Sequence, residues 1–172
     1  ARYVLTGERL SLNFVQKMSG IATYTRKFQN VLDECGVRIV DTRKNTPNFR
    51  LFEKYSVKVG ATKVHRFNLS DCVMLKDNHI ALYNGSITKA VAEVRKFLSH
   101  AHKIEVECDT LEQVAEALEN KVDIIMLDNM SLENMKKACE LINKKAVVEA
   151  SGQVTIDTVE DIAQTGVDVI ST

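Results

Sequence analysis

Short apolar runs recur along the chain, and stretches of helical character separate most of them. Six runs rich in Val and Ile read as strands, at residues 37–41, 72–76, 103–108, 122–128, 146–150 and 167–171. These runs are apolar at nearly every position, which is typical of strands buried on both faces of a parallel sheet. The pattern therefore predicts an α/β fold.

The segments between the runs carry helix signals. Residues 3–35 contain few breakers and predict one long helix, or two with a break near Gly20. Thr46 followed by Pro47 predicts a helix start, and Thr110 with Gln113 predicts a capping box. From residue 37 onward, the alternation of strand and helix favours a barrel or a doubly wound sheet.

A chain of 172 residues is long enough for one domain with its own core. We expect residues 1–172 to form an incomplete parallel (β/α) barrel domain, with residues 1–36 as a helical lead-in and residues 37–172 as the barrel. The chain begins with Ala rather than Met and closes within a strand and its loop, so we expect a fragment.

Composition limits the function classes. The 23 Lys and Arg residues balance the 23 Asp and Glu residues, so no overall charge would attract nucleic acid or an anionic membrane. The four cysteines are widely spaced without a CxxC pair, which favours reduced, packed thiols over a disulfide framework or a zinc site. No run is long enough to span a membrane, and no signal peptide is evident. We expect a cytoplasmic protein.

Polar and charged residues stand where each predicted strand ends. They are Asp41 to Lys44, Lys76 to His79, Glu105 and Glu107, Asp128 and Asn129, Glu149 with Ser151 and Gly152, and Ser171 and Thr172. The carboxyl ends of the strands in a parallel barrel converge on one mouth, where active sites are built. The sequence therefore predicts one site with a basic wall and an acidic wall.

The basic wall is formed by Arg43, Lys44, His65, Arg66 and Lys76. Arginine offers a planar fork that suits carboxylate or phosphate, and lysine offers a point charge. Several such residues near strand ends predict an anionic ligand with more than one negative group.

The acidic wall includes Glu105 and Glu107, which point to the same face of one strand. Buried carboxylates are costly unless a cation pairs with them, so Mg²⁺ or a basic partner is implied. Asp128 on the next strand can complete a Mg²⁺ site with waters. The alternative is that Glu105 only forms an ion pair with Lys76 or Lys44.

The EASGQ segment, residues 149–153, ends a strand in a small turn before a helix expected near Thr155. Backbone N–H groups at a helix start bind phosphate, so Ser151 and Gly152 are candidate phosphate-binding residues. An ordinary turn is the alternative.

An ordered set of motifs resembles the quinolinate phosphoribosyltransferase family. The motifs are GERLSLNF, SGIAT, DTRKNTPNFR, EKY, HRFNLSD, MLKDNHI, EVEC, DIIMLDN, EASG and TGVDVIS. The resemblance implies phosphoribosyl transfer from phosphoribosyl pyrophosphate to quinolinate, with Mg²⁺ and loss of carbon dioxide, in a homodimer or higher homo-oligomer. It also implies that an N-terminal sandwich domain of the family is absent from this chain.

The resemblance assigns roles to individual residues. Arg43, His65, Arg66 and Lys76 bind the dicarboxylate, Lys44 reaches toward both substrates, and Arg9 enters the site of a neighbouring subunit. Glu107 and Asp128 hold the Mg²⁺ and the ribose, and Ser151 and Gly152 bind phosphate. Glu105 is placed deeper, as the partner of a buried base.

One departure from the family pattern lies before His65, where Ala61 and Thr62 replace expected glycines. A turn with positive φ would strain Thr62. Asn48 also stands where Gly is common, but Asn tolerates such angles.

Other functions stay open at this point. They are a related phosphoribosyltransferase acting on another acid, a Schiff-base lyase with Lys44 or Lys76 as nucleophile, and a ligand-binding relative without catalysis.

Overall fold

A six-stranded parallel sheet forms the centre of the protein in a computed structural model that describes residues 1–61 and 63–172. The strands are β1 (Arg38–Val40), β2 (Val73–Leu75), β3 (Ile104–Cys108), β4 (Ile124–Asp128), β5 (Val147–Ser151) and β6 (Val169–Ser171). All six predicted strands are confirmed. Their order is β1-β6-β5-β4-β3-β2, so β1 and β2 are the edges of the sheet.

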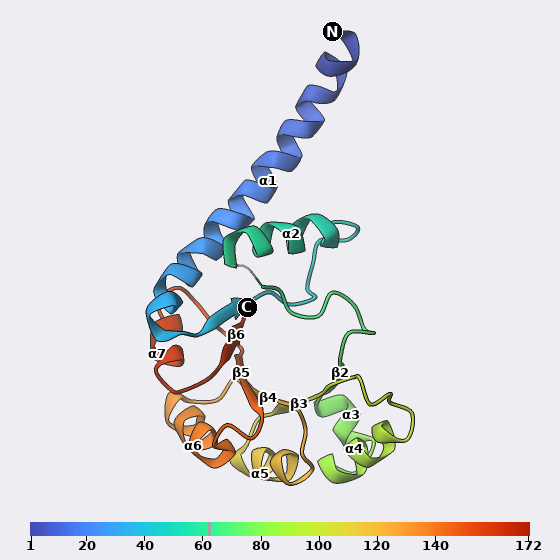
Figure 1. Ribbon diagram of the computed structural model, residues 1–172, viewed down its shortest axis with the longest axis vertical. Coiled ribbons are helices and arrows are strands. Elements are labelled where there is room, and N and C mark those ends of the chain that lie inside the picture. The colour runs from blue at the N-terminus through green and yellow to red at the C-terminus, as the bar shows by residue number, and fades with distance from the viewer. Residues whose placement is uncertain (62) are drawn as a thin grey trace.

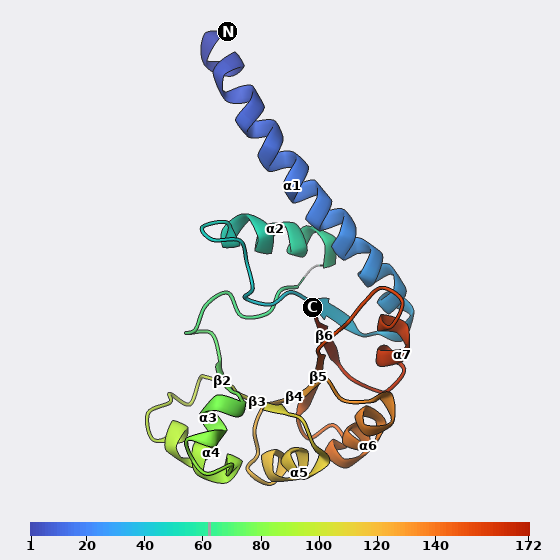
Figure 2. The same cartoon turned by 180° about the vertical axis from the view of Figure 1, so that it is seen from behind.

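Helices pack around this curved sheet. They are α1 (Arg2–Leu32), α2 (Arg50–Ala61), α3 (Asp77–Ala81), α4 (Ile87–Arg95), α5 (Leu111–Glu119), α6 (Leu132–Ile142) and α7 (Val159–Ala163), with a 3-10 turn, η1, at Asp33–Cys35. Helices α3 to α7 follow one another around the outside of the arc of strands (Figures 1 and 2). This arrangement confirms the incomplete barrel, because a doubly wound sheet has helices on both faces.

The strands alternate between two environments. Val106, Ile125, Val148 and Ile170 are buried against the outer helices at exposures of 2% or less. The residues between them face the inside of the arc, where Glu107 of β3 lies opposite Met126 of β4 in the strand register. Polar side chains therefore gather on the concave side, and the apolar core lies between the sheet and the helices.

Helix α1 is a single helix of 31 residues, without the break considered near Gly20. It packs against α2, and the rings of Phe14 and Phe52 meet edge to face with centroids 5.0 Å apart. Gly60 permits this approach, since a Cβ there would lie 2.6 Å from the carbonyl oxygen of Ala22. The first turns of α1 extend away from the rest of the molecule (Figure 1). In the described part of the chain, no helix is both long enough and apolar enough to cross a membrane.

The segment from residue 41 to residue 72 connects one edge strand to the other. Helix α2 within it begins at Arg50, so the predicted start at Pro47 is wrong. Asn48 has φ +62°, as its side chain tolerates, and this angle cannot continue a right-handed helix from Pro47. Ala61 is the last residue of α2, and Thr62, where strain was predicted, lies outside the described residues.

Candidate functional site

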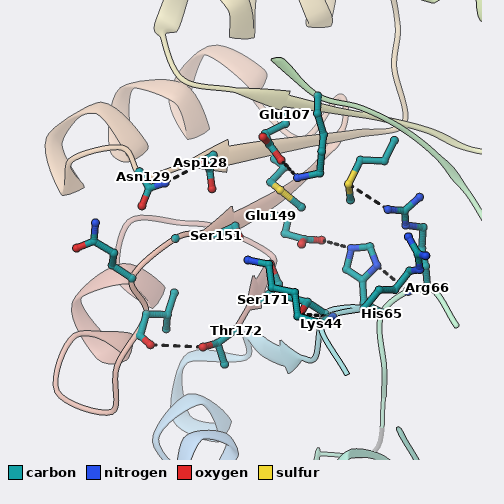
Figure 3. A pocket seen from close by; sticks show the side chains of 18 residues that line it. Lys44, His65, Arg66, Glu107, Asp128, Asn129, Glu149, Ser151, Ser171 and Thr172 are labelled. Atoms are coloured by element: carbon teal, nitrogen blue, oxygen red, sulfur yellow. Dashed lines mark hydrogen bonds and ion pairs between the residues drawn. The ribbon is translucent and has the colours of Figure 1, made fainter. Parts of the chain in front are cut away.

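A cavity of about 740 Å³ opens at the carboxyl ends of the strands. It is lined by Thr42, Arg43, Lys44, His65, Arg66, Met74, Lys76, Glu107, Met126, Asp128, Asn129, Glu149, Ser151, Gly152, Gln153, Val154, Ser171 and Thr172. Every residue that the resemblance places at the substrates, the Mg²⁺ or the phosphate lines the cavity, except Arg9. Figure 3 shows His65 and Arg66 toward one side of the cavity and Asp128 and Asn129 toward the other, with Glu149 beside His65.

The basic side of the cavity is partly fixed by the protein itself. The guanidinium of Arg66 donates to the carbonyl oxygen of Cys72 at 3.0 Å and contacts the sulfur of Met74 at 3.2 Å. The Nε atoms of Arg66 and Arg43 are buried and, among the described residues, have no hydrogen-bond partner. Buried donors without an acceptor are costly, so an anionic ligand would find donors already desolvated here.

The acidic side comes from neighbouring strands. Glu107 on β3 forms an ion pair with Lys76, which follows β2. Asp128 ends β4 and accepts a hydrogen bond from the side-chain amide of Asn129 at 2.8 Å. Two carboxylates at one cavity match the one or two carboxylates by which proteins usually hold Mg²⁺ alongside water and phosphate oxygens.

A second acidic pair lies beneath the cavity. Glu105 is fully buried, and Glu149 is 3% exposed. Both approach the Nε2 atom of His65, at 3.5 Å from Glu105 and 3.2 Å from Glu149. The alternative partners for Glu105, Lys76 and Lys44, are thus wrong, because the cation that this carboxylate meets is His65.

His65, Glu105 and Glu149 form a buried cluster whose environment favours protonation. Burial of the imidazole acts to lower its pKa, but the hydrogen bonds and charges of Glu105 and Glu149 outweigh burial and raise the pKa of His65 to about 9. Burial also raises the pKa of Glu105. The backbone N–H of Arg66 lies 2.6 Å from Nδ1 of His65. The two carboxylates thus favour the protonated form of His65 at neutral pH.

Both ring nitrogens of His65 are therefore engaged within the protein. Nε2 faces the two carboxylates, and Nδ1 faces the backbone of Arg66. The ring lines the cavity, but neither ring nitrogen is free to bind a ligand. Its contact with the backbone N–H of Arg66 holds that residue in place. The three side chains offer metal-ligand atoms within 4.8 Å of one another, but their short contacts to one another identify a charge network.

The turn after β5 has an unusual backbone. Gly152 has φ +96°, and Gln153 has φ +48°. A Cβ on Gly152 would lie 2.3 Å from the side-chain oxygen of Asn129 and 2.9 Å from its backbone nitrogen. The turn is thus built around glycine at the cavity wall. The helix expected near Thr155 begins later, at Val159.

Comparison with known proteins decides the family. The family model described as quinolinate phosphoribosyl transferase, C-terminal domain, matches residues 21–172. The chain belongs to this family. A probable carboxylating nicotinate-nucleotide pyrophosphorylase of Synechocystis is 49% identical over 171 residues, which are 98% of this chain and 58% of that protein.

Solved structures of relatives agree with this assignment. The nicotinate-nucleotide pyrophosphorylase of Ehrlichia chaffeensis is 50% identical, with a TM-score of 0.92, over 98% of this chain and 61% of that one. NadC from Streptococcus pyogenes is 46% identical, with a TM-score of 0.94, over 100% of this chain and 60% of that one. The chain thus spans about three fifths of the length of the quinolinate phosphoribosyltransferase relatives it matches.

Arg9 is the predicted site residue that stands apart. It lies near the N-terminal end of α1, whose first turns extend away from the rest of the molecule (Figure 1). Its side chain is exposed. Its assigned place in a neighbouring subunit of a quinolinate phosphoribosyltransferase stays a prediction.

Sequence reasoning missed the part played by Glu149 and the two methionines of the cavity, Met74 and Met126. Register could have found all three, since Met74 pairs with Glu105 and Met126 pairs with both Glu107 and Glu149. Residues paired across parallel strands point to the same face of the sheet. The missing information was the strand order.

Proposed function

We propose that the full-length protein containing this chain transfers the phosphoribosyl group of phosphoribosyl pyrophosphate to quinolinate and releases carbon dioxide, giving nicotinate mononucleotide for NAD biosynthesis. The observation that carries the proposal is the single cavity that brings Arg43, Arg66 and Lys76 together with Glu107 and Asp128. Relatives named carboxylating nicotinate-nucleotide pyrophosphorylase support it.

The basic side would bind quinolinate. This substrate carries two adjacent carboxylates on a pyridine ring, and guanidinium groups bind carboxylates through charge-assisted hydrogen bonds. The buried Nε donors of Arg43 and Arg66 would gain acceptors. His65 would contribute by holding the backbone of Arg66.

The acidic side would hold Mg²⁺ and the ribose. Carboxylate oxygens are ligands that Mg²⁺ prefers, and Glu107 and Asp128 supply them from adjacent strands. When bound, Mg²⁺ would neutralise charge on the pyrophosphate leaving group. Lys44 would add a second positive charge there, and Ser151 with Gly152 would contact the 5′-phosphate.

No protein nucleophile is needed for this reaction. Breakage of the bond between the anomeric carbon and pyrophosphate leaves positive charge on the ribose, which Glu107 and Asp128 stabilise electrostatically. The pyridine nitrogen donates its electron pair to the anomeric carbon. The adjacent carboxylate then leaves as carbon dioxide, its bonding electrons remain on the ring carbon beside the positive nitrogen, and that carbon takes up a proton.

The structure argues against the Schiff-base alternative at Lys76. Its side-chain nitrogen forms an ion pair with Glu107, so a carboxylate already engages the atom that would attack a carbonyl. We also propose that the active form is a homodimer in which Arg9 of one subunit completes the site of the other.

The test is an assay of the full-length protein with quinolinate, phosphoribosyl pyrophosphate and Mg²⁺. We expect pyrophosphate and carbon dioxide to appear in equal amounts, and neither to appear without Mg²⁺. Pyrophosphate release without carbon dioxide, from nicotinate or another acid, would favour the related transferase. Binding of quinolinate without turnover would identify a relative without catalysis.

A further inference from the structure

Lys54 is a buried lysine that does not line the cavity. It lies on α2, its side chain is 3% exposed, and its ammonium lies 2.9 Å from Oδ1 and 2.8 Å from Oδ2 of Asp41. A buried ammonium loses its hydration and is costly unless it is paired and hydrogen-bonded. Here the carboxylate provides the pairing.

The Lys54–Asp41 pair joins two segments that are distant in sequence. The ammonium of Lys54 also lies 3.5 Å from the carbonyl oxygens of Thr42 and His65. Oδ1 of Asp41 accepts a hydrogen bond from the backbone N–H of His65 at 3.1 Å. The backbone at residues 41–42 is thereby tied to the backbone at residue 65 through one buried ion pair.

These two segments carry most of the basic wall. Arg43 and Lys44 follow the first anchor point directly, and Arg66 follows the second. By contrast, Glu107, Asp128 and Ser151 stand on strands β3 to β5, which Lys54 does not contact through any hydrogen bond or ion pair in the described residues.

We propose that Lys54 is a positioning residue that sets the spacing between Arg43 and Arg66, and thereby the fit of the cavity to a planar dicarboxylate. This inference rests on the proposed function, because the spacing matters only if quinolinate is the substrate. The pair acts through backbone anchors and touches no substrate. Misplacement of binding groups by about 1 Å can cost as much as 10²-fold in rate, so the loss of this anchor has a measurable consequence.

The test uses the full-length protein with Lys54→Met, which keeps the length and burial of the side chain but removes its charge. We expect the Kd and KM for quinolinate to rise roughly 10- to 100-fold, while the Kd for phosphoribosyl pyrophosphate with Mg²⁺ changes much less. Lys54→Arg, which keeps the charge, should restore part of the quinolinate affinity. Lys58→Met is the matched control, since Lys58 is exposed one turn later on the same helix, and it should behave as wild type.

A second variant covers the case in which Lys54→Met does not fold. Asp41→Asn combined with Lys54→Met removes both buried charges, so it should fold more stably than the single variant and still bind quinolinate poorly. Wild-type affinity for quinolinate in either variant overturns the proposal, as does an equal loss of affinity for both substrates. If the wild-type protein itself does not bind quinolinate, the proposed function fails instead.

Discussion

Glu105 and Glu107 lie two residues apart on β3 and point to the same side of the sheet, yet they meet different cations at different depths. Glu105 is fully buried and faces His65 beneath the cavity. Glu107 lines the cavity and pairs with Lys76. One strand thus supplies a carboxylate for the interior and another for the site.

Replacement of the two acids should therefore produce different defects. Glu107→Gln should lower turnover by roughly 10²- to 10³-fold through lost electrostatic stabilisation, with little change in melting temperature. Glu105→Gln should destabilise the fold by about 3 kcal/mol, since it removes half of the negative charge around a buried imidazole. Thermal melts and turnover of both variants measure this. A stable, inactive Glu105→Gln with an unstable Glu107→Gln would reverse the assignment.

Arg66 should contribute to quinolinate binding through its geometry as well as its charge. Arg66→Ala should raise the Kd for quinolinate by at least about 10-fold, because a charge-assisted hydrogen bond contributes roughly 1.5–3 kcal/mol. Arg66→Lys should recover only part of the loss, since lysine lacks the planar fork. Arg38→Ala, at the exposed opposite end of β1, serves as the control. Calorimetric titration of the folded variants decides, and near-normal affinity in Arg66→Ala would refute the assignment.

Variants of Arg9 can test whether two subunits share one active site. If Arg9 acts in the neighbouring subunit, Arg9→Ala and an inactive Lys44→Ala variant should each lose activity, and their mixture should regain part of it through hybrid dimers that hold one intact site. Turnover is measured before and after the subunits exchange. Absence of any recovery, although mass spectrometry shows that hybrids form, would rule out a shared site.

Gly152 should be intolerant of any side chain. Gly152→Ala places a methyl group against Asn129 at a position with φ +96°, so it should cost about 1–3 kcal/mol from backbone strain, with a further penalty from the clash. Gly85→Ala separates the two contributions, because Gly85 has φ +81° but open space around it. Urea unfolding compares the two variants, and equal losses would show that the contact with Asn129 carries no cost.

The His65 cluster predicts how stability depends on pH. The pKa of His65 rises from 6.5 to about 9 on folding, and the pKa of Glu105 also rises. The folded state therefore holds more protons than the unfolded state above pH 6.5, so its stability is full below that value and is lost as the pH rises toward 9. Urea unfolding between pH 6.5 and 8.5 should show this decline. His65→Gln should flatten it, and a rise in stability over this range would contradict the cluster.

The sequence by itself determined the six strands, the parallel fold and the polar residues at the strand ends. These depend on local signals, such as continuous Val and Ile runs and the capping box of Thr110 and Gln113, which the structure contains. Such signals act over a few residues, so a single sequence is enough to detect them. The start of α2 was misjudged because Asn48 takes a positive φ, which competes with the helix signal of Pro47.

Only the tertiary structure decided which charged groups are partners. His65 meets Glu105 and Glu149, and Lys54 meets Asp41, across separations of 40, 84 and 13 residues. Each pairing depends on strand order and on the path of residues 41–72 from one edge of the sheet to the other. The physical reason is that a buried charge is stabilised by whichever opposite charge the fold brings close to it. The pattern of residues along the chain does not show which two charges will be close in space.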